Sequence, residues 1–322
     1  MKTETGNDDT TADGRKRNGG RPGPFAGTEA RGMEWHPGRD EAFDGFSVLI
    51  PSWNNLEYLR LCVEGIRRFS SRRHQIVLHV NEGSDGTLEW ARKEGLAHTW
   101  TEKNTGICWG VNAARGLAKG KYLVYMNDDM VPCPGWDAAL EREIGRAPGD
   151  WFCLSATMIE PYPTRSRPVV APVDFGLTPG TFDADRLVRE AGGLAKRHWA
   201  GSTRPPTLVP AALWDLVGGY STEFSPGLYS DPDFTMKLWR AGVRWFMGVG
   251  DSLVYHFVSK TLSRLEPNDG RRQFLRKWGI TAREFQNRYL RLGEDFAGAL
   301  EYPKGAGLRL AKAKNWVEGL LA

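Results

Sequence analysis

The stretch YLVYMNDDMVP, residues 122–132, joins an apolar run to two adjacent carboxylates. The run YLVYM is typical of a buried strand, and it ends at Asn127, Asp128 and Asp129. Two neighbouring carboxylates repel each other and are costly to bury, and a divalent cation held by their oxygens would offset both effects. Because Asn and Asp are also favoured in solvated turns, the stretch alone leaves a metal site and a plain turn open.

The segments before this stretch alternate between strand and helix patterns. Apolar runs predict strands at 46–51, 75–80 and 121–126, and helical spacing predicts helices at 56–69, 87–95 and 110–120. Continuous apolar strands joined by helices indicate a parallel sheet that is covered on both faces and connected by right-handed crossovers. The expected fold class is therefore α/β.

Polar, turn-forming clusters follow each of the three predicted strands, at 51–55, 81–84 and 127–129. In open sheets of this kind, ligands bind outside the carboxyl ends of the strands. We therefore expect the three clusters to lie together at one rim of the sheet and to form the substrate site.

The rest of the chain shows weaker patterns. Residues 1–44 are rich in Gly, Pro and charge, which predicts a mostly disordered tail, and residues 151–205 are expected to form strands and loops along an acceptor cleft. Helices are expected at 209–220 and 231–242, and strands at 243–249 and 252–258. The expected domains are the tail at 1–44, a main domain at 45–265 with halves at 45–130 and 131–265, and a helical extension at 266–322.

Composition is that of an ordinary globular protein: 322 residues, 25% charged and 40% hydrophobic. A net charge of +4 does not by itself argue for nucleic-acid binding. The four cysteines form no CxxC pair, so we expect a reduced, cytoplasmic protein. Because no apolar run approaches the roughly 20 residues that span a bilayer, we expect no transmembrane segment.

The segment GLRLAKAKNWVEGLLA, residues 307–322, mixes basic and apolar residues. A basic amphipathic helix can lie on an anionic membrane surface, which would make the protein peripheral to a membrane. Packing of this helix onto the main domain is the simpler interpretation, and both remain open at the level of sequence.

Five blocks between residues 46 and 242, taken in order, resemble the family 2 glycosyltransferases. The blocks are SVLIPSWNN, VLHVNEGSDGT, KNTGICWGVNAARGLAKGKYLVYMNDDM, LVGGYSTEF and YSDPDFTMKLWRAG, and His256 extends the similarity. The resemblance implies a GT-A fold, with a Rossmann-like, mostly parallel sheet flanked by helices and a C-terminal helical extension. It also implies an inverting transferase that uses a nucleotide-diphosphate sugar.

A nucleotide-sugar site is the first consequence of this resemblance. The residues that it implies as contacts are Pro51, Trp53, Asn54, Asn81, Glu82, Asn104, Gly106, Asn112 and Asp128. Trp53 matches an aromatic position that stacks on the base. Asn81 stands where the family usually has an Asp that accepts from a uracil N–H. Since an amide can either accept or donate, the base preference stays open.

Metal and acid–base chemistry form the second consequence. Asp129 matches the main metal ligand and His256 a second one, and carboxylate oxygens suit Mn²⁺ or Mg²⁺. Asp231 matches the general base, with Asp233 as the fallback, while Ser230 replaces the usual Glu partner. Helix capping would equally explain both Asp residues, and His256 would equally serve as a core histidine.

The predicted function is transfer of a hexosyl or deoxyhexosyl group to a hydroxyl acceptor by a metal-assisted single displacement. The acceptor is expected to be a glycan, a lipid-linked molecule or another hydroxyl compound, and nothing in the sequence selects a nucleic-acid acceptor. The alternative is a catalytically inactive GT-A-like module that binds a nucleotide or glycan, which the departures at Asn81 and Ser230 allow. A nucleotidyltransferase is disfavoured, because the loop at 51–55 is not a Gly-rich basic loop.

Overall fold

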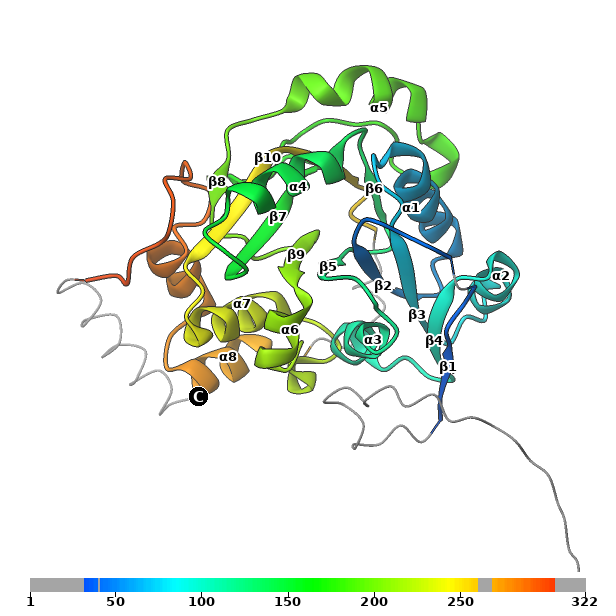
Figure 1. Cartoon of the computed structure of the whole chain (residues 1–322), viewed down its shortest axis with the longest axis horizontal. Coiled ribbons are helices and arrows are strands. Elements are labelled where there is room, and N and C mark those ends of the chain that lie inside the picture. Colours follow the sequence, from blue (N-terminus) through cyan, green and yellow to red (C-terminus); the bar gives the residue numbers. More distant parts are fainter. Residues whose placement is uncertain (1–31, 40, 260–267, 305–322) are drawn as a thin grey trace, which may run out of the picture.

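The computed structural model describes residues 32–39, 41–259 and 268–304, which build one mixed sheet with helices on both faces (Figure 1). The strands are β1 (Met33–His36), β2 (Ser47–Trp53), β3 (Gln75–Asn81), β4 (Ala97–Thr101), β5 (Tyr122–Tyr125), β6 (Met130–Pro132), β7 (Phe152–Ile159), β8 (Trp199–Ala200), β9 (Thr207–Pro210) and β10 (Trp245–His256). The α-helices are α1 (Leu56–Phe69), α2 (Thr87–Glu94), α3 (Gly106–Arg115), α4 (Trp136–Arg146), α5 (Ala184–Glu190), α6 (Ala211–Val217), α7 (Ser230–Ala241), α8 (Gly270–Trp278) and α9 (Ala282–Glu284). Short 3₁₀ turns η1 (Pro179–Thr181), η2 (Ala191–Leu194) and η3 (Thr222–Phe224) and the π-helix η5 (Phe285–Tyr289) complete the described elements.

The strand order is β1-β4-β3-β2-β5-β9-β7-β10-β6, and β8 pairs with β10. The strands β4, β3, β2 and β5 run parallel, which confirms the parallel sheet predicted for the first half. β9 is antiparallel to both β5 and β7, so it joins the first half of the sheet to the second. The carboxyl ends of β2, β3 and β5 therefore lie at one rim.

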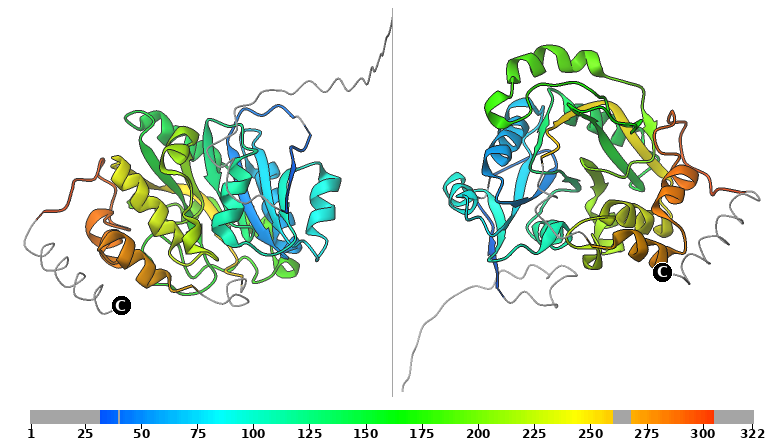
Figure 2. Two further views of the ribbon diagram at one scale, coloured as in Figure 1. Left: turned by 90° about the horizontal axis from the view of Figure 1, so that it is seen from below. Right: turned by 180° about the vertical axis from the view of Figure 1, so that it is seen from behind.

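Two hydrophobic layers hold helices against opposite faces of the sheet (Figures 1 and 2). Helices α1, α2 and α4 pack on one face, and α3, α6, α7 and α8 pack on the other. In α1, for example, Leu59, Cys62, Val63 and Ile66 are buried with helical spacing. Burial of each such side chain contributes about 1.5–3 kcal/mol, so the apolar stripe accounts for the position of the helix.

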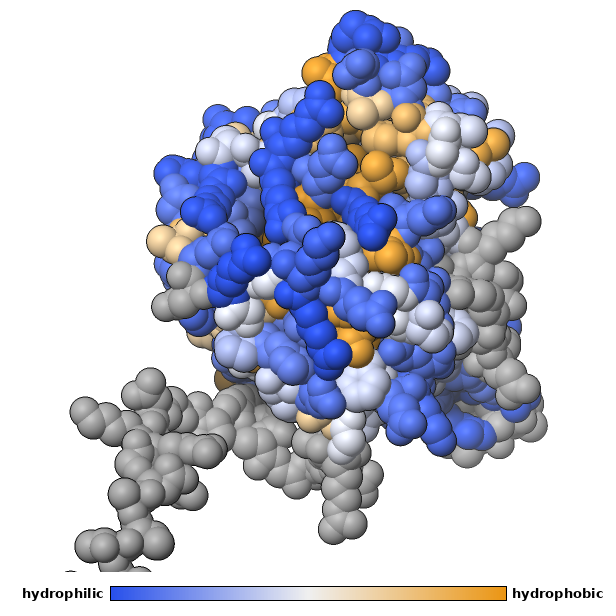
Figure 3. Space-filling model, turned by 90° about the vertical axis from the view of Figure 1, so that its right-hand side faces the viewer, coloured by the Kyte–Doolittle hydropathy of each residue, from blue (hydrophilic) through white to orange (hydrophobic). Residues whose placement is uncertain are grey.

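A third apolar cluster places α5 over the ends of β6 and β10. It includes Val131, Leu187 and Tyr255, which come from β6, α5 and β10 in turn. On the side of the molecule where α1 and α2 lie in Figure 1, hydrophilic side chains cover most of the surface and apolar ones show between them (Figure 3).

The N-terminal segment departs from the sequence prediction. Residues 33–36 form β1, which pairs antiparallel with β4, so a disordered tail over residues 1–44 is wrong for this part. Trp35 lies against Gly116, and the ring of His36 stacks on that of His98 with centroids 4.5 Å apart. Ordering this segment costs conformational entropy, which its own composition could not offset. The backbone pairing with β4 and these ring contacts offset it. Residues 1–31 lie outside the described part of the chain.

Other elements also differ from the pattern-based prediction. The strands expected at 243–249 and 252–258 are one strand, β10, with a register irregularity between Val249 and Leu253. β4 was not predicted, because AHTWT carries few aliphatic residues. β2 continues through Pro51 to Trp53, which is tolerated because its pairing with β5 ends at Leu49.

Within the residues that the structure describes, no helix is both long and apolar enough to cross a membrane. The basic segment at 307–322, for which the sequence leaves membrane contact open, lies outside the described residues.

Candidate active site

The carboxylate pair lies directly after β5, at the rim where β2 and β3 also end. Asp128 and Asp129 are 8% and 5% exposed. Asp128 Oδ2 accepts a hydrogen bond of 2.7 Å from Ser52 Oγ near the end of β2. This bond ties the loop after β5 to the neighbouring strand, so the carboxylates have a fixed place at the rim.

Asp129 faces residues at the end of β10. Its Oδ2 accepts from the backbone N–H of Ser259 at 2.8 Å, and its Oδ1 lies 3.5 Å from His256 Nε2. Burial raises the pKa of Asp129, but the charge of His256 and the bonds from His256 and Ser259 outweigh burial and lower it. Asp129 is therefore held as a carboxylate.

The other ring nitrogen of His256 has its own partner. Nδ1 of His256 lies 2.9 Å from Oε1 of Glu160, the residue that follows β7. Burial lowers the pKa of His256, while the flanking Asp129 and Glu160 carboxylates raise it to about 10. Glu160 thus orients the imidazole ring, and Nε2 of the ring is directed toward Asp129.

These donors fit a hard divalent cation in their chemistry. Two carboxylates and an imidazole that has released its proton suit Mn²⁺ or Mg²⁺, and a carboxylate on the far ring nitrogen is the usual support of a metal-binding histidine. In the described part of the chain, no three His, Cys, Asp or Glu side chains already form a metal cage. A cation here would therefore need further ligands from a phosphate-bearing substrate or from water.

Asp231 lies in the first turn of α7. It is partly buried, and the hydroxyl of Tyr220 donates a 3.0 Å hydrogen bond to its Oδ1. Burial raises the pKa of Asp231 to about 6, against smaller lowering effects of Tyr220 and Arg204. A carboxylate with this pKa is largely ionised at neutral pH and is basic enough to accept a proton.

Two tyrosines connect the carboxylate pair to Asp231. The hydroxyl of Tyr125, at the end of β5, donates to Asn127 Oδ1 at 3.0 Å. The ring of Tyr125 meets that of Tyr220 edge to face, with centroids 5.4 Å apart. Burial and then the charges of Asp231, Cys108, Asp128 and Asp129 raise the pKa of Tyr125, so both carboxylate groups act on one hydroxyl.

Asp233 occupies a different environment from Asp231. Its side chain is fully buried, and its Oδ1 accepts from Lys277 Nζ at 2.9 Å and from Trp278 Nε1 at 2.8 Å. Both partners belong to α8, on the core side of α7. This placement does not support the expectation that Asp233 is an alternative base.

Trp53 and Asn81 are neighbours across the β2–β3 ladder, and Asn81 pairs in turn with Thr101 on β4. Trp53 is partly exposed, whereas Asn81 is 3% exposed. The side-chain oxygen of Asn81 accepts from the backbone N–H of Thr105 at 2.8 Å and from its hydroxyl at 3.0 Å. Asn81 thus fixes the chain at the start of α3.

Asn54 and Glu82 also lie together at this rim. Asn54 Nδ2 donates to Glu82 Oε2 at 3.0 Å, which links the loops that follow β2 and β3. Both residues have positive φ, 46° and 60°. Such backbone conformations are disfavoured for non-glycine residues and concentrate at functional sites.

The remaining predicted nucleotide contacts have structural partners. Pro51 is buried within β2, and Asn104 Oδ1 accepts from Gly106 N at 2.9 Å. Gly106 has a φ of 82°, and a Cβ there would lie 2.7 Å from Pro226 Cα. Asn112 exchanges two hydrogen bonds with the backbone of Tyr220, at 2.7 and 2.9 Å. Asn112 therefore positions the residue that holds Asp231, and both of its amide atoms are already occupied.

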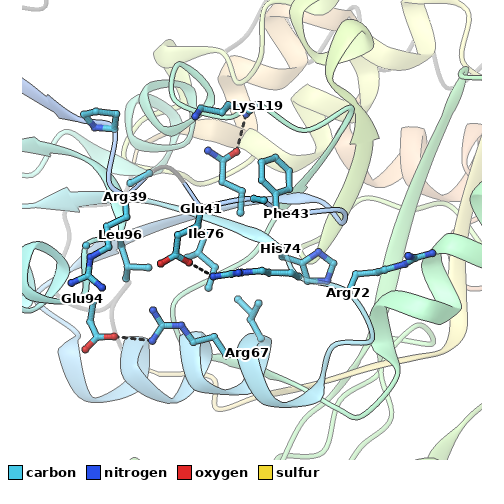
Figure 4. A pocket seen from close by; sticks show the side chains of 17 residues that line it. Arg39, Glu41, Phe43, Arg67, Arg72, His74, Ile76, Glu94, Leu96 and Lys119 are labelled. Carbon is cyan, nitrogen blue, oxygen red and sulfur yellow. Dashed lines mark hydrogen bonds and ion pairs between the residues drawn. The ribbon is translucent and has the colours of Figure 1, made fainter.

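A separate cavity of about 430 Å³ lies at the amino ends of β3 and β4 (Figure 4). Ile76 and Leu96 line it together with the Arg67–Glu94 ion pair, whose atoms are 2.8 Å apart. Because the candidate site lies at the carboxyl ends of the strands, this cavity is not part of it.

Sequence reasoning missed four residues that shape the site: Ser52, Tyr125, Glu160 and Tyr220. Ser52 and Tyr125 lie in or directly beside motifs that were recognised, and their polar groups at strand ends were the available signal. Glu160 and Tyr220 are far in sequence from their partners, so no local pattern could pair them with His256 and Asp231.

Comparison with known proteins supports the family resemblance of the sequence blocks. Residues 47–190 match the model of glycosyl transferase family 2. The chain thus carries a family 2 glycosyltransferase domain with the GT-A fold, as its sequence blocks indicated. The comparison with curated protein sequences found no match.

Solved structures resemble the chain at the level of fold. TarS 1–349 of S. aureus in complex with UDP-GlcNAc has a TM-score of 0.52 and 17% identity, covering 86% of this chain and 72% of that one. A second structure of the same TarS fragment has a TM-score of 0.52 and 14% identity, covering 86% of this chain and 71% of that one. GalNAc-T7 with UDP, GalNAc and Mn²⁺ has a TM-score of 0.50 and 13% identity, covering 78% and 52%.

Proposed function

We propose that this glycosyltransferase moves a sugar from a nucleotide-diphosphate sugar to a hydroxyl acceptor by a single displacement that inverts the anomeric centre. The observation that carries the proposal is the environment of Asp231. Its carboxylate is partly exposed, is oriented by Tyr220 and has a pKa raised to about 6. A general base for a sugar or lipid hydroxyl needs these properties.

In the proposed reaction, Asp231 accepts the proton of the acceptor hydroxyl while the hydroxyl oxygen attacks the anomeric carbon. The new C–O bond forms as the bond to the diphosphate breaks, and the nucleoside diphosphate leaves with the electron pair. Tyr220 keeps Oδ1 of Asp231 oriented through its hydrogen bond. The second carboxylate oxygen is then available to receive the proton.

Asp129, Asp128 and His256 are the residues that we propose to hold Mn²⁺ or Mg²⁺. When bound, the cation would neutralise charge on the departing diphosphate. Asp128 is anchored by Ser52 and His256 by Glu160, so their coordinating atoms are oriented in advance. The complexes of TarS with UDP-GlcNAc and of GalNAc-T7 with UDP and Mn²⁺ support a nucleotide-diphosphate sugar as the class of donor and a divalent cation as its partner.

The finer assignments extend this proposal. We assign the main catalytic domain to residues 45–265, with nucleotide binding on 45–130 and acceptor binding on 131–265. The transferred group is a hexosyl or deoxyhexosyl residue, and the acceptor is a glycan, a lipid-linked molecule or another hydroxyl compound.

Replacement of Asp231 by Asn tests the general base. Asn keeps the size of the side chain and can still accept from Tyr220, but it cannot take a proton at neutral pH. We expect kcat to fall about 10²–10⁴-fold, with little change in the Kd of the nucleoside diphosphate. The measurement is product formation by mass spectrometry over a panel of nucleotide sugars, with isothermal calorimetry for binding.

Two further variants complete this experiment. Asp251→Asn removes a carboxylate that is exposed on β10 and paired with Arg142, and it should leave turnover unchanged. Asp129→Ala should abolish the dependence of nucleotide binding on Mn²⁺. Wild-type turnover in both Asp231→Asn and Asp129→Ala would refute the assigned roles. Nucleotide binding by wild type without product for any donor and acceptor would instead indicate a binding module.

A further inference from the structure

The two polar atoms of the Asn81 side chain are used unequally. Oδ1 accepts from the backbone N–H and the hydroxyl of Thr105, and Thr101 Oγ1 and His79 Nε2 lie 3.4 and 3.2 Å from the same oxygen. Nδ2 has no hydrogen-bond partner in the part of the chain that the structure describes. Asn81 therefore keeps a single unused polar function, its NH₂ donor.

The orientation of this amide is fixed by the backbone. The atom 2.8 Å from Thr105 N must accept, because a backbone N–H can only donate. Rotation of the amide by 180° would place two donors against each other and leave both unpaired. The unused atom of Asn81 is thus a nitrogen, and it cannot exchange places with the oxygen.

The location of Asn81 suits the base of a nucleotide. Trp53 is its register partner on β2, and β5 adjoins β2 on the opposite side from β3 (Figure 1). Ser52, which donates to Asp128, pairs with Val80, the residue before Asn81, and adjacent strands are about 4.8 Å apart, so Asn81 lies roughly 10 Å from Asp128. A nucleoside whose diphosphate is held at Asp128 and Asp129 would span this distance, with its base beside the partly exposed Trp53.

We propose that Asn81 selects a base whose Watson–Crick edge offers a ring-nitrogen acceptor, which means a cytidine or adenosine diphosphate sugar as donor. This inference rests on the proposed nucleotide-sugar function. The N3 atom of cytosine and the N1 atom of adenine accept hydrogen bonds. Uracil and guanine carry an N–H at the corresponding positions, which would face the NH₂ of Asn81 and leave two donors unpaired.

The test measures binding of CDP, ADP, UDP and GDP with Mn²⁺ to the intact wild-type protein by isothermal calorimetry. We expect CDP or ADP to bind about tenfold more tightly than UDP and GDP. Asn81→Asp keeps an oxygen toward Thr105 and replaces the NH₂ by an acceptor of similar size. In that variant the preference should reverse toward UDP or GDP.

Asn127→Asp is the matched control for charge. It adds a carboxylate next to Asp128 and away from Asn81, so any change in affinity should be the same for all four nucleotides and the CDP-to-UDP ratio should stay unchanged. Asn81→Ala lacks both polar atoms and should bring the CDP-to-UDP ratio close to one. This variant replaces Asn81→Asp in the test if Asn81→Asp does not fold.

Two outcomes overturn the inference, and they differ from failure of the proposed function. Tighter binding of UDP or GDP to wild type would refute the base assignment while leaving nucleotide-sugar chemistry in place. An unchanged CDP-to-UDP ratio in both Asn81 variants would show that Asn81 does not contact the base. If none of the four nucleotides binds to wild type, the proposed function itself fails and the inference fails with it.

Discussion

At the scale of single residues, Asp231 and Asp233 show how one helix gives two carboxylates separate tasks. Residues two apart on an α-helix point about 200° apart, so both could not face one cleft. Asp231 faces Tyr220, and Asp233 faces Lys277 and Trp278 on α8. The sequence could have predicted that only one of the pair is catalytic, but the choice between them depends on α8, which is distant in sequence.

The raised pKa of Asp231 also has a cost in stability. The folded state keeps a proton on Asp231 up to about pH 6, whereas the unfolded chain loses it near pH 4. The cost is therefore absent below pH 4, grows between pH 4 and 6 and is complete above pH 6. For this partly exposed group it amounts to about 1–3 kcal/mol.

Asp231→Asn should consequently raise Tm at pH 8 and leave it nearly unchanged at pH 4. The neutral amide removes the penalty for burying charge while keeping an acceptor for Tyr220. Calorimetric scans of both proteins at the two pH values measure the effect. An equal shift at both pH values would show that packing, and not the ionisation of Asp231, causes the change.

At the scale of elements, α8 holds the segment that presents Asp231. Lys277 Nζ lies 2.9 Å from Asp233 Oδ1 on α7, 2.7 Å from Glu223 Oε1 and 2.9 Å from Ser221 Oγ. Gln273 Nε2 donates to the backbone oxygen of Glu223 at 2.7 Å. The helical extension thus fixes both α7 and the turn η3, which follows Tyr220.

Lys277→Met should destabilise the protein by about 3 kcal/mol, because it leaves Asp233 buried without its cation. The double variant Lys277→Met/Asp233→Asn should recover a large part of this loss, since Trp278 can still donate to the amide oxygen. Urea unfolding followed by circular dichroism gives both values. Additive effects of the two substitutions would show that the pair is not coupled.

Elements with a strong repeating pattern were predicted well. The apolar stripe of α1 and the left-handed Gly95 after α2 lie where the sequence indicated. α3 ends at Arg115, earlier than the predicted stop at Gly120, because the next N–H groups, from Gly116 to Ala118, bond three residues back and not four. β1 could not be predicted, since its stability comes from pairing with β4 and not from its own composition.

At the scale of the whole molecule, Asp137 ties the two predicted halves together. This α4 residue is fully buried and accepts from Ser71 and from the backbone N–H of Arg72, and it lies 3.2 Å from His74 Nε2. Burial raises the pKa of Asp137, but the hydrogen bonds from His74, Ser71 and Arg72 outweigh it and hold the pKa far below its usual range.

Asp137→Asn should cost about 2–4 kcal/mol near pH 7, because the buried donors around it lose a charged acceptor. A lowered pKa means that the stabilisation is complete above pH 4 and is lost as the pH falls below it. The gap between variant and wild type should therefore narrow from pH 7 to pH 3 in urea titrations. Asp251→Asn, at an exposed ion pair, should stay within about 0.5 kcal/mol at both pH values.

The position of β9 determines when the two halves of the sheet can join during synthesis. β9 fills the gap between β5 and β7, yet it follows β7 by nearly fifty residues of chain. Until Thr207–Pro210 leaves the ribosome, β5 and β7 each present an unpaired edge. A nascent or truncated chain that stops before residue 207 is therefore expected to aggregate or to require a chaperone, although the parallel half of its sheet is already complete.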